Sequence, residues 1–222
     1  MSTTTAEPGF AARSVADIAA SLPGATAVFR RHKLDFCCGG KAALSDAAAV
    51  RGADLSTVIA ELSALVQAAA EAPSDTDALI GLIETRYHAT HRRELPELVR
   101  LARRVEAVHG DLPHAPVGLA AVLEALAAEL ESHMQKEEQV LFPLMRRGGH
   151  PMIAHPIDAM RHEHDDAGEL LARVEALTGG GVPPEGACNT WRALYAGTRK
   201  FADDLMEHIH LENNVLFPRF EA

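Results

Sequence analysis

The feature that most constrains this chain is an eleven-residue pattern that occurs twice, once mid-chain and once near its end. The segments His133–Pro143 and His208–Pro218 both read H-x3-E-x2-V-L-F-P. Residues four apart lie on the same face of an α-helix, so each histidine is placed beside its glutamate. Imidazole and carboxylate are common metal ligands. Two such pairs predict a helical bundle that brings them to one site.

The composition limits the class of protein. The 222-residue chain has few aromatic residues (5%) and much alanine and leucine, which favours helices over a β-sandwich. Its formal net charge of −10 argues against a nucleic-acid partner. No apolar run approaches the roughly 18–20 residues of a membrane span, and no secretory signal is visible. Three cysteines are too few for a disulfide framework. We therefore expect a soluble, cytoplasmic protein with neither a nucleic-acid nor a membrane partner.

The chain is expected to divide at a break in its helical pattern. Pro73-Ser74-Asp75 interrupts that pattern and offers residues to cap a new helix. Ser14 is expected to cap a short helix, with Asp17 in the capping-box position. The expected segments are a disordered N-terminus (1–13), a small helical domain with a Cys-Cys-Gly-Gly motif (14–72) and an all-α four-helix bundle (75–222).

Four long helices fit the bundle. Gly- and Pro-rich breaks separate them, and such short connections favour an up-down-up-down arrangement. Pro143 and Pro218 come late in their helices and should kink or end the last turns, and Pro96 should bend the first helix. The expected helices cover about 76–108, 117–147, 153–178 and 185–220.

Apolar residues at steps of three and four mark the inward face of each helix, and histidine or glutamate interrupts each stripe. A buried polar group costs a few kcal/mol unless it is paired, so these residues require a partner. On the second helix the stripe includes Val140 and Leu144, and on the fourth it includes Val215. On the first helix both His88 and His91 fit. The 45-residue spacing from His88 to His133 nearly matches the 44 residues between His164 and His208, which favours His88.

Six inward ligands result: His88, His133, Glu137, His164, His208 and Glu212. They are too many for one zinc ion, which takes four ligands in all, and they suit two ions bridged by the glutamates. The absence of thiolate points to iron or manganese, and the imidazoles favour iron. Glu129 and Glu163 lie near these histidines and are candidates for carboxylates that support the ligands or line a channel. The other histidines considered, expected to be solvated or bridging neighbours, are His91, His109, His162 and His210.

Two adjacent cysteines form a separate motif. Cys37 and Cys38 precede two glycines and an expected helix start, where the helix dipole lowers the pKa of a thiol. We expect a redox, nitrosyl or metal-binding role, against the alternative that they are buried apolar side chains. Cys188 is expected to be structural.

With these motifs, over roughly 14–222, the sequence resembles the iron–sulfur cluster repair di-iron proteins, also called repair-of-iron-centres proteins. In that family a small domain with a C-C-G-G motif precedes a hemerythrin-like four-helix bundle. The segments that carry the resemblance are Asp35–Lys41, Tyr87–Leu98, Ser132–Pro143, Glu163–Leu170 and His208–Pro218.

The resemblance implies a non-haem di-iron centre, oxo- or hydroxo-bridged, held by the six ligands above. It implies repair of clusters damaged by oxidative or nitrosative stress, through iron donation or nitric oxide chemistry. The implied partners are damaged iron–sulfur proteins and nitric oxide or reactive oxygen species. A homodimer is a family-level alternative, and whether the protein is an enzyme that reduces nitric oxide stays open. The resemblance also implies functional roles for Cys37, Cys38, Glu129 and Glu163.

Three other functions agree less well with the sequence. A hemerythrin-like carrier or sensor of oxygen or nitric oxide uses more imidazole, and the second bridging carboxylate and the cysteine domain argue against it. A ferritin-like oxidase uses E-x-x-H spacing, which the ligand positions lack. A purely structural bundle leaves six buried polar groups unexplained.

Overall fold

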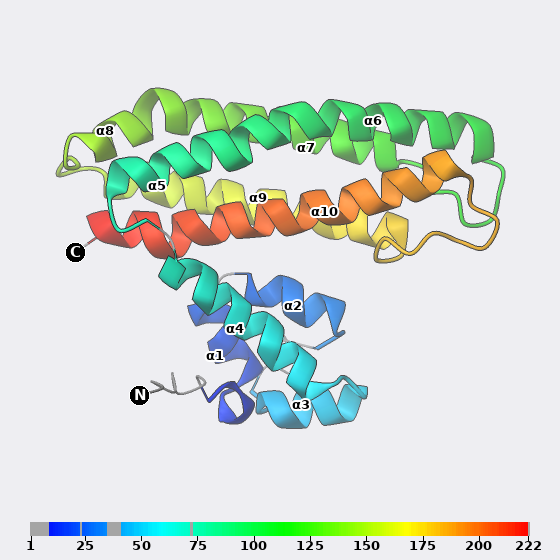
Figure 1. Ribbon diagram of the computed structural model, residues 1–222, viewed down its shortest axis with the longest axis horizontal. Coiled ribbons are helices and arrows are strands. Elements are labelled where there is room, and N and C mark those ends of the chain that lie inside the picture. Colours follow the sequence, from blue (N-terminus) through cyan, green and yellow to red (C-terminus); the bar gives the residue numbers. More distant parts are fainter. Residues whose placement is uncertain (1–8, 23, 35–40, 72, 222) are drawn as a thin grey trace. The chain divides into compact units, whose positions relative to one another are not determined.

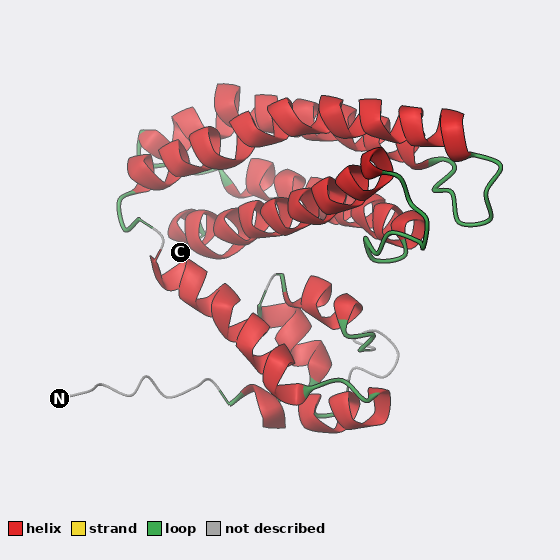
Figure 2. Ribbon diagram, turned by 45° about the vertical axis from the view of Figure 1, so that its right-hand side comes forward, coloured by secondary structure: helices red, strands yellow, loops and turns green. Residues whose placement is uncertain are grey.

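The structure, a computed structural model, describes residues 9–22, 24–34, 41–71 and 73–221. Within these ranges the chain forms helices, turns and loops, and no strand (Figure 2). Among the described helices, none combines the length and the apolar character that a bilayer-spanning segment needs. The all-α prediction is therefore confirmed.

The chain forms two compact units. One consists of Met1–Ala72 with Ile209–Val215, and the other of Pro73–His208 with Leu216–Ala222. Ile209–Val215 continues the last helix of the bundle, and its Glu212 lies within ligand distance of side chains from the other bundle helices. We therefore describe this segment with the bundle.

The N-terminal unit is built from short helices around its own apolar core. Ser14 caps the first α-helix as predicted, because its Oγ accepts a hydrogen bond from the Asp17 amide at 3.0 Å. Phe10 is buried within a 3₁₀ turn, although it lies in the segment 1–13 that was expected to be disordered. The elements are η1 (Phe10–Ala12), α1 (Val15–Ser21), α2 (Ala25–Arg31), α3 (Leu44–Arg51) and α4 (Leu55–Glu71).

An isolated antiparallel bridge ties the start of α1 to the start of α3. The Val15 amide donates to the Ala42 carbonyl at 3.0 Å, and the Leu44 amide donates to the Arg13 carbonyl at 2.9 Å. Cys37 and Cys38 lie in the connection between α2 and α3, outside the described residues, so their role stays a prediction.

The bundle consists of four long helical segments that lie side by side (Figure 1). The first hairpin comprises α5 (Thr76–Leu82), η2 (Ile83–His88) and α6 (Ala89–His109), followed by α7 (Leu119–Lys136), η3 (Glu137–Leu141) and α8 (Phe142–Arg146). The second hairpin comprises α9 (Ala154–Thr178), followed by α10 (Asn189–Leu211), η4 (Glu212–Leu216) and η5 (Phe217–Phe220).

The ends of these helices follow from local chemistry. Asp75 caps α5, since its Oδ1 accepts from the Ala78 amide at 2.8 Å. Gly179 ends α9 in a left-handed conformation with φ of 58°, which glycine adopts at little cost. Pro96 lies inside α6, and the helix continues past it to His109.

The inward faces agree with the predicted stripes before each H-x3-E motif. The buried apolar side chains include Leu119, Val122, Leu126 and Leu130 on α7, Ile157, Met160, Leu171 and Val174 on α9, and Trp191, Leu194, Phe201 and Leu205 on α10. Each α-helical stripe leads to a buried histidine, so the bundle positions the candidate ligands toward its interior.

After the first motif the predicted stripe is wrong. Glu137–Leu141 forms a π-helical turn, in which the Phe142 amide donates to the Glu137 carbonyl five residues earlier. A π turn adds one residue to the helical repeat and so moves the inward face one position along the chain. Val140, predicted to face the core, is 54% exposed, whereas Leu141 and Phe142 are buried.

The second motif repeats this shift. Glu212–Leu216 is also π-helical. Leu216 and Phe217 are fully buried, whereas Val215, predicted to face the core, is only partly buried. Pro143 and Pro218 follow these turns: the first lies at the start of α8 and the second within the 3₁₀ turn η5.

Candidate metal centre

The structure brings the six predicted ligands together in two groups. The ligand atoms within each group lie within 4.8 Å of one another. Every side chain is buried, with residue exposures between 0 and 5%. The first group is His88, Glu137, His208 and Glu212, and the second is His133, Glu137, His164 and Glu212. The two glutamates therefore belong to both groups.

The histidines pair across the two hairpins. The Nε2 atoms of His88 and His208 are 3.1 Å apart, and those of His133 and His164 are 3.2 Å apart. Each pair takes one imidazole from the first hairpin and one from the second. The internal repeat gave each hairpin one lone histidine and one H-x3-E pair, but neither hairpin forms a group by itself.

Glu137 lies where the two groups meet. Its Oε2 atom is 3.4 Å from Nε2 of His88 and 3.3 Å from Nε2 of His133. Its side chain is fully buried. One carboxylate oxygen is therefore near an imidazole of each group.

These distances fit a metal ion. An ion held about 2.1 Å from each donor brings neighbouring donors to about 3.0–3.4 Å of one another in octahedral or tetrahedral geometry. The donor separations of 3.1 to 3.4 Å fall in that range. Each group offers two imidazoles and two carboxylates without a thiolate, a donor set suited to iron and other divalent first-row metals.

In the first group, a carboxylate fixes the orientation of His88. Its Nδ1–H donates to Oε1 of Glu138 at 2.7 Å, which leaves Nε2 to face the group. Arg92 donates to both oxygens of Glu138, at 2.7 and 3.1 Å, and also to Glu131. Burial raises the pKa of Glu138, but Arg92 and His88 outweigh it and hold that pKa below its ordinary value.

Glu138 is a site residue that sequence reasoning missed. Charged residues on a helix are usually solvated, so Glu138 and Arg92 gave no reason to expect an inward role. The signal available was the Glu137-Glu138 pair directly after the histidine turn.

In the second group, Glu163 plays the corresponding part. The Nδ1–H of His133 donates to Oε2 of Glu163 at 3.0 Å, and Lys136 donates to Oε1 at 2.6 Å. Burial raises the pKa of Glu163, but Lys136 and His133 outweigh it and lower that pKa. Glu129 is exposed and, with Glu163, lines a pocket of about 300 Å³ that His133 and His164 also line.

Aromatic rings pack against both groups. His88 stacks on Phe142 at 5.8 Å between ring centroids, and His164 stacks on Phe217 at 6.1 Å. Each Leu-Phe-Pro segment thus supplies one ring. His208 stacks on Tyr87 at 5.6 Å, and burial raises the pKa of this phenol, so it stays neutral.

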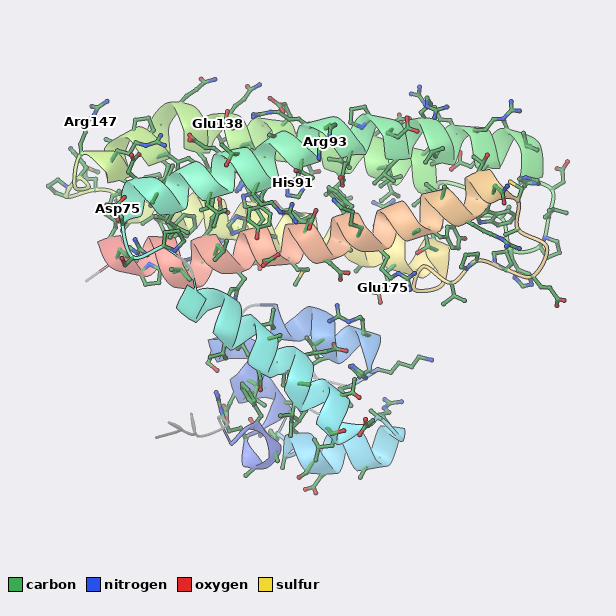
Figure 3. All side chains as sticks on the ribbon, viewed as in Figure 1. Asp75, His91, Arg93, Glu138, Arg147 and Glu175 are labelled. Carbon is green, nitrogen blue, oxygen red and sulfur yellow. The ribbon has the colours of Figure 1, made fainter. Side chains whose placement is uncertain are left out.

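Two further histidines, expected to be solvated or bridging neighbours, are buried and therefore not solvated. His91 is fully buried within the bundle (Figure 3). Its ring lies 5.2 Å from that of Phe201 and 5.3 Å from that of His208. His210 is 1% exposed, and its Nδ1 accepts a hydrogen bond from the side-chain Nδ2 of Asn214 at 2.7 Å.

The remaining candidates lie elsewhere. His162 is exposed, as expected, and its Nδ1 donates to the Asp158 carbonyl at 2.7 Å. His109 stacks on Trp191, and its Nε2 lies 3.2 Å from Sγ of Cys188. Neither His109 nor Cys188 belongs to the two groups.

Comparisons with known proteins agree with this geometry. Residues 83–220 match the hemerythrin HHE cation-binding domain family, and residues 11–66 match ScdA_N, a domain of unknown function (DUF542). The chain is 51% identical over 212 residues to the iron–sulfur cluster repair protein YtfE of Yersinia pseudotuberculosis (strain IP 31758), covering 93% of this chain and 96% of the relative. The YtfE protein of Yersinia pestis (strain Pestoides F) matches with the same identity and coverage.

The resemblance inferred from the motifs is thus confirmed over nearly the whole chain. The protein belongs to the hemerythrin HHE family and, within it, to the iron–sulfur cluster repair proteins of the YtfE type.

Proposed function

We propose that this protein repairs iron–sulfur clusters damaged by oxidative or nitrosative stress, using a non-haem di-iron centre. The observation that carries the proposal is the pair of buried four-residue groups that share Glu137 and Glu212. The relatives named for cluster repair support the biological role.

In this proposal His88 and His208 would hold one ion and His133 and His164 the other, and the shared Glu137 and Glu212 would hold both, with an oxo or hydroxo group as a further bridge. Bound iron would supply one-electron chemistry and open coordination positions for small ligands such as nitric oxide or reactive oxygen species. The chain's own residues fix the donors: Glu138 and Glu163 hold the Nδ1–H of His88 and His133, so that both Nε2 atoms face inward.

Access to the centre is also part of the proposal. Glu129 and Glu163 line the pocket that reaches His133 and His164, and we assign them to the passage of small molecules or iron. At the other group, Phe142 and Tyr87 pack against the imidazoles and limit the entry of water.

The rest of the proposal concerns organisation. We assign residues 14–72 to a separate small domain in which Cys37 and Cys38 take part in repair through thiol redox or nitrosyl chemistry. The partners are damaged iron–sulfur proteins in the cytoplasm. A homodimer is the assembly that the family resemblance suggests.

Full-length protein loaded with iron tests this function. The protein is added to an enzyme whose iron–sulfur cluster has been nitrosylated or oxidised, and recovery of that enzyme's activity is measured against free ferrous iron at equal concentration. Recovery beyond that of free iron is expected. Recovery no greater than that, or a stable and reversible oxygenated spectrum without repair, would favour a carrier instead.

A double variant separates the two domains in the same assay. Replacing Cys37 and Cys38 with serine should leave the iron content unchanged and impair repair. A loss of iron in this variant would contradict the assignment of the metal to the bundle alone.

A further inference from the structure

The two histidine groups share their glutamates but differ in their surroundings. We propose that the metal position of His133 and His164 exchanges its ion much faster than the position of His88 and His208, and that Lys136 controls this exchange by holding Glu163. The inference rests on the proposed di-iron function and goes beyond it, because it assigns different roles to the two positions.

The two positions differ in their access to solvent. His133 and His164 are 3 and 5% exposed and line the pocket of about 300 Å³, which Glu129, Lys136 and Glu163 also line. Water or a chelator can reach this position from the pocket. His88 and His208 have no exposed surface.

The two positions also differ in the packing of their imidazoles. The ring of His88 contacts Phe142 and His208, with centroid distances of 5.8 and 4.8 Å. His208 in turn packs on Tyr87 and His91 at 5.6 and 5.3 Å. For either imidazole to swing away from an ion, these buried rings would have to move as well. The rings of His133 and His164 also lie 4.8 Å apart, and His164 packs on Phe217. Both of these imidazoles border the pocket, however, so either can turn toward open space without moving a neighbouring ring.

The carboxylates that support His88 and His133 are held by different cations. Arg92 grips both oxygens of Glu138 with two N–H groups, and its planar guanidinium fixes the carboxylate in direction as well as distance. Glu163 is held by the single ammonium of Lys136, whose side chain is 50% exposed on a flexible stem. Glu163 can therefore release the Nδ1–H of His133 more readily than Glu138 releases that of His88.

Together these differences define an order of events for exchange. The Lys136–Glu163 pair opens and Glu163 releases His133. Water or a chelator would then replace all four protein donors of the departing ion, His133, His164, Glu137 and Glu212, and the two glutamates would stay bound to the other ion. The oxidation state of the ion does not change in this exchange. Lys136 is a positioning residue, because it acts on the ion through Glu163 and His133.

The test follows iron release from the full-length ferrous protein into an excess of a chromogenic ferrous chelator. We expect two phases of equal amplitude. Lys136→Gln should speed the fast phase about 10-fold or more and leave the slow phase unchanged, by analogy with other losses of groups that support metal ligands. Lys136→Arg should not speed the fast phase and should slow it where the guanidinium binds both oxygens of Glu163. Arg92→Gln should instead speed the slow phase.

A control variant and a spectroscopic readout complete the design. Arg103→Gln breaks an exposed ion pair with Glu124 and should alter neither phase. Protein loaded with ⁵⁷Fe and then briefly exchanged with natural iron should lose one of two Mössbauer signals, and Lys136→Gln should shorten the time needed. Circular dichroism checks that each variant is folded.

The outcomes separate the inference from the function on which it rests. Release of both ions in one phase, or a fast phase that responds to Arg92→Gln and not to Lys136→Gln, overturns the inference while cluster repair can remain intact. Protein that binds no iron overturns both. Two phases with the expected responses but no cluster repair would support the inference and count against the proposed function.

Discussion

The two copies of the H-x3-E-x2-V-L-F-P pattern adopt the same local structure in different settings. In both, the glutamate begins a π turn and the phenylalanine is buried. In the first copy, His133 donates to the partly exposed Glu163, and the chain continues as α8. In the second, His208 packs on Tyr87 and His91, and the chain continues as the 3₁₀ turn η5.

The repeated residues and the residues around them therefore determine different properties of each copy. The repeated residues give each copy its π turn and its inward histidine, glutamate and aromatic ring. The residues outside the repeat decide what holds each imidazole and how far solvent reaches it. Equal motifs therefore need not give equal metal positions, and matched substitutions in the two copies can measure the difference.

The largest effect is expected from the shared glutamates. Glu137→Gln and Glu212→Gln should each lower the iron content of both positions, because each carboxylate belongs to both groups. Metal analysis of the folded variants checks this, with Glu131→Gln as a surface control. If either variant kept one tightly bound iron, the two glutamates would not be shared equally.

The next largest effect is on stability, at the residues that the π turns place toward the core. Leu141→Ala and Leu216→Ala should each destabilise the metal-free protein by about 2–5 kcal/mol, since both side chains are almost fully buried. Val140→Ala, at the exposed neighbouring position, should change stability by less than about 0.5 kcal/mol. Urea unfolding followed by circular dichroism measures all three. A Val140→Ala cost as large as that of Leu141→Ala would rule out the π turn.

An ion pair to the first helix precedes each copy, and the two pairs should differ in strength. Asp204, 6% exposed, accepts from Arg86 at 2.7 Å and from Lys200 at 2.7 Å. Glu131 accepts from Arg92 but has a side chain that is 41% exposed. Asp204→Asn should cost about 1–3 kcal/mol, and Glu131→Gln about 1 kcal/mol or less. Similar costs for the two variants would remove this contrast.

The cost of Asp204→Asn should also depend on pH. Burial raises the pKa of Asp204, but Arg86 and Lys200 outweigh it and hold that pKa below 3.8. A carboxylate with a lowered folded-state pKa contributes its full stability above the ordinary pKa and loses it as pH falls through the folded-state value. The difference between wild type and variant should therefore be constant near neutral pH and disappear in strong acid, as unfolding curves across that range can measure.

The smallest effect is expected at a side-chain pair found in the second copy. Asn214→Ala removes the partner of Nδ1 of the buried His210 and should cost about 1 kcal/mol. Gln139→Ala, the matching exposed position in the first copy, should be close to neutral. Thermal unfolding of the metal-free variants compares them, and an equal response would mean that this pair adds nothing to the second copy.

Much of the fold follows from sequence because its signals are local. Apolar spacing, the caps at Ser14 and Asp75 and the glycine breaks predict the helices and their inward faces before each motif. The same spacing places all six candidate ligands on inward faces, and the structure gathers them; their role as ligands stays a prediction. The near-equal repeat spacing favoured His88, which lies in a group, over the neighbouring His91.

The rest depends on tertiary contacts. A π turn changes the face of every residue after it, so a fixed helical period placed Val140 and Val215 wrongly. The pairing of His88 with His208 depends on which helices become neighbours, and a repeat inside each hairpin carries no signal for that choice. Glu138 and Arg92 have the composition of a solvated surface, and only the position of His88 gives them a second role.

The pairing of histidines across hairpins also has a consequence for chain topology. His88 and His208 are 120 residues apart, whereas His133 and His164 are 31 apart. Through its imidazoles alone, an ion at the first pair would close most of the bundle into one loop, and an ion at the second pair would close a much shorter loop; the shared Glu137 and Glu212 would add to both closures. Closing the 120-residue loop costs the unfolded chain about 1 kcal/mol more conformational free energy than closing the 31-residue loop. An ion at His88 and His208 would therefore cross-link the first and last helical segments of the bundle. Loss of the ion at His133 and His164 would leave this cross-link in place.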